Sequence, residues 1–183
     1  MSYSRVLLVP LPSQPNRAPR PNIGLGYVAE SLLNARIEYD VFDMLLGYDI
    51  NSLKNKIAQF KPDLIGINMF THHYLRNYDT IRDIKKSFPQ VKTVLGGPHI
   101  STLKSQVLLD CAAIDYGVMY EGEEKLIRLC RGENETDIPG LIFRNNGEVI
   151  CNEPGSVRER YIQDLSCVAF PTYHKFEVEK YLQ

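Results

Sequence analysis

Five strand-like runs, each followed by a stretch with helical spacing, constrain this chain more than any other feature. The runs are RVLLVPL at 5–11, EYDVFDM at 38–44, DLIGINMF at 63–70, VKTVLGG at 91–97 and IDYGVMY at 114–120. Most are continuously apolar, which is typical of strands buried on both faces of a parallel sheet. Amphipathic helical spacing follows them, most clearly at 23–35, 50–60 and 74–88, with Asn51 or Ser52 as a cap for the second. This order predicts an α/β fold whose parallel sheet is covered by helices on both faces.

The order of these units also favours one topology. Crossovers between parallel strands are right-handed, and 183 residues leave room for one such domain with a small appendage. We therefore expect a flavodoxin-like, doubly wound, parallel five-stranded sheet with the strand order 2-1-3-4-5. In such sheets ligands bind beyond the carboxyl ends of the strands, so a binding site is expected at that edge.

The chain changes character after residue 135. The run GLIFRNNGEVICNE at 140–153 predicts a β-hairpin, because two β-rich segments flank Asn146-Gly147, a dipeptide typical of tight hairpin turns. The hairpin is expected either outside the sheet or as an extension of its edge. The final stretch, 158–183, has no clear period and indicates a linker. We expect a Rossmann-like binding domain over 1–135 and a hairpin and linker over 136–183, cut from a longer protein.

Composition and motif content argue against several functions. A net charge of −1 without a basic stripe gives no reason to expect a nucleic-acid partner. No apolar run approaches the roughly 20 residues that cross a bilayer, and the N-terminus lacks signal-peptide features, so a cytoplasmic protein without membrane contact is expected. No catalytic triad or nucleophile elbow is visible, which favours a binding module without catalytic residues of its own. The cysteines lack CxxC spacing, which indicates reduced thiols in or near the core: Cys111, Cys130, Cys151 and Cys167.

The candidate binding site consists of the loops that follow the first, third, fourth and fifth strands. Its residues are Asn22, Ile23, Gly24 and Leu25; Asn68, Phe70, Thr71, His72 and His73; Gly96, Gly97, Pro98 and His99; and Tyr120, Glu121, Gly122 and Glu123. Two glycines at the end of a buried strand indicate either an unusual backbone angle or the close approach of a ligand.

Each loop also has an alternative interpretation. Gly24 and Gly26 at a helix start could bind phosphate, but the GxGxxG pattern of dinucleotide sites is incomplete. His72 and His73 suit either a ligand pocket or a plain helix start. A zinc site is disfavoured, because sequence neighbours seldom face one ion and no carboxylate stands at ligand spacing. The glutamates around Gly122 also stabilise a helix N-terminus without any ligand.

Six motifs in this order resemble the N-terminal cobalamin-binding domain of the B12-dependent radical S-adenosylmethionine (SAM) proteins. They are PNIGLGYVAESL at 21–32, PDLIGIN at 62–68, VLGGPH at 94–99, YEGEEKL at 120–126, IPGLIFRNNG at 138–147 and FPTY at 170–173. That family includes methyltransferases and the anaerobic magnesium-protoporphyrin monomethyl ester cyclase. The resemblance implies that the candidate residues bind cobalamin, whose nucleotide tail passes beside the sheet against bare backbone at Gly96 and Gly97. A valine at Gly97 is then expected to block the tail with little loss of fold, whereas a turn glycine with positive φ would make the same change destabilising.

The sequence departs from known B12 domains at two places. Domains of the methionine synthase type carry DxHxxG after the first strand, and its histidine ligates cobalt. Pro19 and Pro21 stand here in place of the aspartate and the histidine. Proline has no ligating side chain, so the resemblance implies base-off cobalamin without a histidine from this loop. The SxL motif after the third strand appears as Asn68-Met69-Phe70.

A larger departure from the whole radical SAM proteins is that their CxxxCxxC motif is missing from this sequence. The resemblance therefore assigns the 4Fe–4S cluster, SAM and the methyl transfer or related radical chemistry to a C-terminal radical SAM domain that this sequence lacks. Two alternatives remain open. One is a degenerate B12-like domain with a structural or partner-binding role, and the other is a flavodoxin-like binder of a nucleotide or flavin.

Overall fold

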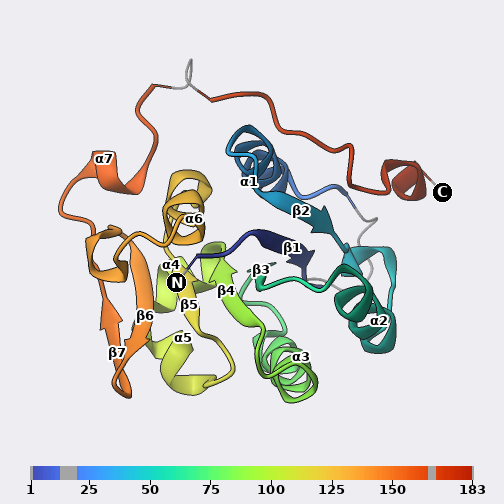
Figure 1. Ribbon diagram of the computed structural model, residues 1–183, viewed down its shortest axis with the longest axis horizontal. Coiled ribbons are helices and arrows are strands. Elements are labelled where there is room, and N and C mark those ends of the chain that lie inside the picture. Colours follow the sequence, from blue (N-terminus) through green and yellow to red (C-terminus); the bar gives the residue numbers. More distant parts are fainter. Residues whose placement is uncertain (1, 13–19, 165–167, 183) are drawn as a thin grey trace.

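The computed structural model describes residues 2–12, 20–164 and 168–182 and contains one seven-stranded sheet with the order β2-β1-β3-β4-β5-β6-β7 (Figure 1). The first five strands run parallel, and the last two are antiparallel to their neighbours. The strands are β1 Arg5–Pro10, β2 Glu38–Val41, β3 Leu64–Asn68, β4 Lys92–Gly96, β5 Tyr116–Val118, β6 Leu141–Asn145 and β7 Glu148–Cys151. The predicted α/β class and the order 2-1-3-4-5 are confirmed, while the strand count is seven instead of five.

The additional strands are the predicted hairpin, which extends the sheet beyond β5. Its turn residues Asn146 and Gly147 have φ values of 49° and 89°. Both central residues of a type I′ hairpin turn need positive φ, which is why Asn-Gly predicted the turn correctly. Of the two placements considered for the hairpin, the structure shows the extension of the edge.

Helices cover both faces of the sheet, with α1 and α6 on one face and α2, α3 and α5 on the other (Figure 1). Their bounds are α1 Ile23–Asn34, α2 Ile50–Phe60, α3 Tyr74–Ser87, α4 Pro98–Leu103, α5 Ser105–Asp110, α6 Glu123–Cys130 and α7 Val157–Arg160. One local prediction was wrong: the cap of α2 is Asp49, whose carboxylate accepts a hydrogen bond from the Ser52 N–H at 2.8 Å. Between β4 and β5 the chain forms two short helices, α4 and α5, separated by Lys104 with a φ of 51°.

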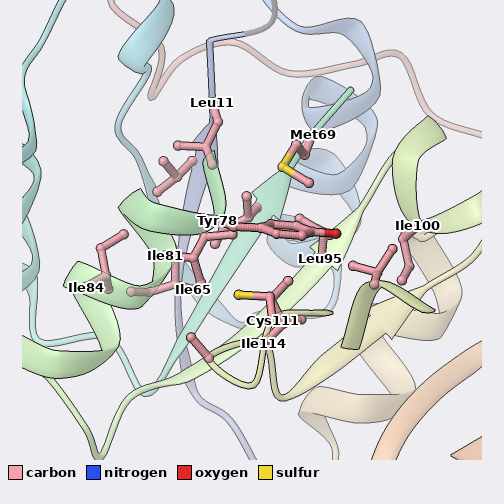
Figure 2. Close-up of a cluster of buried hydrophobic side chains, with 14 of the residues drawn as sticks. Leu11, Ile65, Met69, Tyr78, Ile81, Ile84, Leu95, Ile100, Cys111 and Ile114 are labelled. Carbon is pink, nitrogen blue, oxygen red and sulfur yellow. The ribbon is translucent and has the colours of Figure 1, made fainter. Parts of the chain in front are cut away.

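The core has two layers because successive strand residues point to opposite faces of the sheet. Leu7 and Val9 of β1 belong to the cluster on the α2 and α3 side, and Val6 and Leu8 belong to the cluster on the α1 and α6 side. Figure 2 shows the first cluster, in which side chains from strands and helices surround the ring of Tyr78. Each fully buried large apolar side chain stabilises the fold by roughly 1.5–3 kcal/mol, so these two layers fix the sheet that carries the site.

The final stretch, expected to be a linker, packs against the domain over residues 171–182. The N–H of Thr172 donates to the carbonyl of Gly26 in α1 at 3.1 Å, and Phe176 is buried in the core layer next to α1. The Tyr181 hydroxyl donates to the buried carboxylate of Asp43. The lack of a sequence period therefore did not mean a lack of packing.

The cysteine prediction is confirmed for three residues: Cys111 and Cys130 are buried free thiols, and Cys151 is a partly buried one. Cys167 lies outside the described residues. No helix in the described part of the chain is both long and apolar enough to span a bilayer.

Candidate functional site

A cavity of about 240 Å³ opens at the carboxyl ends of the parallel strands, between α1, α6 and the sheet. The fold places it there because β1 and β3 are neighbours whose crossovers leave in opposite directions, so the following loops part. It is lined by Leu8, Gly24, Leu25, Val28, Gly66, Ile67, Asn68, Val94, Gly96, Gly97, Val118, Tyr120, Glu121, Gly122, Glu123 and Leu126. Its walls are mostly apolar, with polar groups gathered on the side of the β5–α6 loop.

Nine of the residues predicted for the site line this cavity, and they come from all four predicted loops: Gly24, Leu25, Asn68, Gly96, Gly97, Tyr120, Glu121, Gly122 and Glu123. Asn22 lies beside them. Its side-chain oxygen caps α1 by accepting from the Leu25 N–H at 2.9 Å, and its amide donates to the Asn68 side chain at 3.0 Å. Asn22 thereby joins the loops after β1 and β3 at one end of the cavity.

Gly66 and Gly96 give the cavity part of its floor. A Cβ built on Gly96 would meet nothing closer than the Ile67 carbonyl oxygen at 4.0 Å, so it would project into free space. A Cβ on Gly66 would lie 3.0 Å from the Leu8 side chain. Both glycines line the cavity, and side chains at these positions would reduce its volume.

Gly97 has a different reason to be glycine, and the prediction that a valine there would spare the fold is wrong. Its φ is 98°, a conformation that L-residues rarely adopt. A Cβ would lie 2.9 Å from the Asn68 amide nitrogen and 3.0 Å from the Met69 carbonyl oxygen. The close approach at Gly97 is therefore that of the protein's own β3–α3 loop, whereas Gly96 faces the cavity.

The polar side of the cavity is the β5–α6 loop, 120–123. Tyr120 has a φ of 63°, and its N–H donates to the Ser101 hydroxyl at 2.8 Å. Glu123 begins α6, and its buried Oε2 has no hydrogen-bond partner among the described residues. Burial raises the pKa of the Glu123 carboxyl above its ordinary value, and the nearby Glu121 raises it further. The Oε2 atom of this carboxyl is thus an unused hydrogen-bonding atom in the wall of the cavity.

His99 was predicted for the site but lies in the core on the α3 side, completely buried. Its ring is 2.7 Å from the Tyr78 hydroxyl and 3.2 Å from the Thr71 hydroxyl, and it stacks on Tyr74. Burial lowers the pKa of His99, which favours the neutral ring. These contacts in the core account for a histidine at position 99, and no bound ligand is needed to explain it.

Six other predicted residues lie outside the cavity. Ile23, Phe70, Thr71, His72 and His73 are exposed near the carboxyl edge, and Pro98 is the first residue of α4. Phe70 is 42% exposed and Ile23 64% exposed, so apolar side chains are presented to solvent beside the cavity. The described part of the chain holds no group of three or more His, Cys, Asp or Glu residues that could bind a metal ion.

Seven of the sixteen cavity residues were not predicted, because the candidate site was drawn from loops alone. The missed residues are Leu8, Val28, Gly66, Ile67, Val94, Val118 and Leu126. Most of them are apolar residues of strands and helices, and in the sequence they cannot be distinguished from residues of the hydrophobic core. Gly66 was the available signal, since a glycine inside a buried strand often marks a close approach of backbone to a ligand.

The two glycines in the first turn of α1, Gly24 and Gly26, are also explained in part by packing. A Cβ on Gly26 would lie 2.9 Å from both the Pro171 side chain and the Tyr173 ring. The phosphate-binding interpretation of Gly24 and Gly26 therefore has a competing explanation at Gly26, while Gly24 lines the cavity.

Sequence relatives of this chain are found among longer proteins. An uncharacterized methyltransferase of Pyrococcus horikoshii is 29% identical over 166 residues, covering 88% of this chain and 35% of the relative. The anaerobic magnesium-protoporphyrin IX monomethyl ester cyclase of Rubrivivax gelatinosus is 30% identical over 138 residues, covering 72% of this chain and 24% of the relative. The chain thus spans about a third or less of the length of these relatives.

Solved structures show the same fold. The radical SAM methyltransferase TsrM from Kitasatospora setae matches with a TM-score of 0.71 and 23% identity, over 84% of this chain and 30% of TsrM. The cobalamin-dependent SAM radical enzyme OxsB, with aqua-cobalamin and SAM bound, matches with a TM-score of 0.72 and 21% identity, over 84% of this chain and 22% of OxsB. Residues 18–129, more than half of the chain, match the family model of the B12 binding domain. The chain therefore belongs to the B12-binding domain family.

Proposed function

We propose that this chain is the cobalamin-binding module of a B12-dependent radical SAM protein and that it holds the nucleotide tail of the cofactor in the cavity between α1, α6 and the sheet. The observation that carries the proposal is the free space over Gly96, where a Cβ would enter a cavity that opens at the carboxyl edge. Family membership supports cobalamin over the alternative of a flavin or nucleotide.

The residues that line the cavity fit the nucleotide tail of cobalamin. The apolar walls from Leu25, Val28 and Val118 suit an aromatic base, and Gly66 and Gly96 leave room for it against the strands. The unpartnered Oε2 of Glu123 suits a hydroxyl or amide donor of the cofactor. When bound, cobalamin supplies a cobalt centre for methyl transfer or related radical chemistry. The protein residues bind and orient the cofactor and exclude water from its tail.

The lower face of the cobalt is proposed to lack a histidine from the loop after β1. Pro21 lies in this loop and has no ligating side-chain atom, and Pro19 lies outside the described residues. His72 and His73 are the first histidines that follow this loop in the sequence, and both are exposed in the β3–α3 loop. Electron paramagnetic resonance of the bound cob(II)alamin tests this directly. We expect no nitrogen superhyperfine splitting, because we expect no imidazole on the lower face of the cobalt. A nitrogen triplet that vanishes in His72→Ala or His73→Ala would show that a histidine of the β3–α3 loop binds the cobalt, and would contradict this expectation.

The catalytic activity is proposed to need a further domain. This chain spans about a third or less of its relatives, and the sequence printed above lacks the CxxxCxxC motif. We infer that residues 1–135 bind the cofactor, that residues 136–183 connect them to a radical SAM domain in cis, and that this domain holds the 4Fe–4S cluster and SAM. TsrM with cobalamin and an iron–sulfur cluster bound supports this division of labour in a protein of the same fold.

Absorption spectroscopy separates this proposal from its competitors. Purified protein is incubated with hydroxocobalamin and then desalted. We expect a corrin spectrum to stay with the protein and to differ from that of free hydroxocobalamin. A degenerate module would lose all corrin absorbance on desalting, and a flavin or nucleotide binder would instead retain flavin mononucleotide or a nucleotide under the same treatment.

A further inference from the structure

Two segments near the C-terminus contact the two sides of the cavity. One is 157–162, which meets the β5–α6 loop, and the other is 171–181, which crosses α1. In Figure 1 this orange-to-red part of the chain passes along the α1 and α6 side of the molecule. Since α1 and the β5–α6 loop both line the cavity, these segments hold opposite walls of the same site.

At the first wall, Tyr120 is enclosed by the segment 157–162. The Tyr161 ring meets the Tyr120 ring edge-on with centroids 5.6 Å apart, and the Arg160 guanidinium lies 5.7 Å from the centre of the Tyr120 ring. The N–H of Ile162 donates to the Glu121 carboxylate. Tyr120 has the positive φ of 63° described above, so these contacts stabilise a conformation that is unfavourable for tyrosine.

At the second wall, the segment 171–181 is fitted to α1. Pro171 and Tyr173 pack so closely on Gly26 that a Cβ there would approach both to 2.9 Å, and Thr172 donates to the Gly26 carbonyl. Gly24 and Leu25, directly before Gly26, line the cavity. Farther along, Glu177 accepts a hydrogen bond from the Tyr48 hydroxyl at 2.7 Å and Asp43 accepts one from Tyr181.

We propose that 157–162 and 171–181 together form a clasp that positions α1 and the β5–α6 loop around the cavity and slows the release of the bound cofactor. This inference rests on the proposed cobalamin-binding function. Tyr161 and Tyr173 are positioning residues, because each contacts a wall of the cavity and neither lines the cavity itself. The clasp makes cofactor retention depend on a part of the chain that lies after the family match to residues 18–129.

Two variants test the clasp in the full 183-residue chain. Gly26→Ala adds a methyl group that collides with Pro171 and Tyr173, yet it favours the helical conformation of α1. Tyr161→Ala removes the ring that packs on Tyr120. The matched control is Gly155→Ala, just before α7, where a Cβ would meet only the Glu159 carboxylate at an ordinary 3.5 Å.

The first readout is the dissociation rate of preloaded cobalamin, followed by corrin absorbance. We expect both variants to release it roughly fivefold faster or more, at the lower end of usual coupling between sites, and the control to match the wild type. The second readout is amide hydrogen exchange of residues 22–28 and 119–123 in cofactor-free protein, which should be faster in both variants while the melting temperature stays within a few degrees of wild type.

Unchanged dissociation and unchanged exchange in both variants would overturn the clasp. If the wild type binds no cobalamin, the proposed function fails, and the exchange experiment alone then decides whether the two segments hold the walls.

Discussion

At the scale of single residues, the two neighbouring glycines at the end of β4 have different physical roles. Gly96 faces free space, and Gly97 combines a φ of 98° with close contacts to Asn68 and Met69. The sequence predicts that glycine is needed at this strand end but cannot separate these causes, because they depend on where the β3–α3 loop lies. The same limit applies to His99, which stands in a predicted binding loop but reaches into the core.

Gly97→Ala should therefore destabilise the fold. We expect a loss of more than about 1 kcal/mol in the free energy of unfolding, from backbone strain plus the clash with Asn68 and Met69. Urea denaturation measures it. Gly147→Ala is the matched control, because Gly147 has a similar φ of 89° but nothing within 4 Å of its Cβ position. Equal losses in the two variants would show that the contacts at Gly97 are unimportant.

Glu123 leads to a prediction about pH. Burial raises its pKa in the folded protein above the ordinary value of 4.5. At a pH between these two pKa values, the folded state holds a proton that the unfolded state has already lost. The contribution of Glu123 to stability is therefore full below pH 4.5 and decreases as the pH rises through the higher folded pKa. Glu123→Gln should remove this decrease. Thermal melting of both proteins between about pH 4 and 8 tests it; parallel pH profiles would contradict the raised pKa.

At the scale of elements, Asp115 connects α3, β4 and β5 near the amino ends of the strands, opposite the cavity. Its carboxylate accepts from Lys85 at 2.6 Å, from Lys92 at 2.8 Å and from the Thr93 N–H at 2.9 Å. Burial alone would raise the pKa of Asp115, but hydrogen bonds from the two lysines hold it below its ordinary value. This network fixes the parallel strands at the edge opposite the cavity.

Asp115→Asn should cost about 1.5–3 kcal/mol of stability at neutral pH, the range for hydrogen bonds to charged groups. Because the folded pKa is lowered, the contribution of Asp115 is present above the unfolded value of 3.8 and is lost as the pH falls through the folded pKa. Chemical denaturation at pH 7 and at acid pH measures both effects. Asp79→Asn, which removes an exposed ion pair with Arg82, is the control and should change little. Equal effects of the two substitutions would count against a structural role for Asp115.

At the scale of the whole molecule, the parallel sheet could be predicted because buried strands read as continuous apolar runs, and the hairpin could be predicted from Asn146-Gly147. The packing of 171–182 could not, since it depends on separate long-range contacts, such as Tyr181 with Asp43 and Phe176 with the core next to α1. The cavity was predictable where loops carry unusual residues, and it was missed where apolar residues of strands and helices serve both core and site. Only the fold distinguishes these two uses.

The most direct test of cobalamin binding in this cavity is a titration with hydroxocobalamin, followed by corrin absorbance, of the wild type and Gly96→Val. The added side chain starts in free space, at least 4.0 Å from other atoms, so the melting temperature should change little. Because it fills the floor of the cavity, the affinity should fall by roughly tenfold or more, equivalent to about 1.4 kcal/mol. A Gly96→Val protein that melts like the wild type and binds cobalamin with the same affinity would contradict the proposed site.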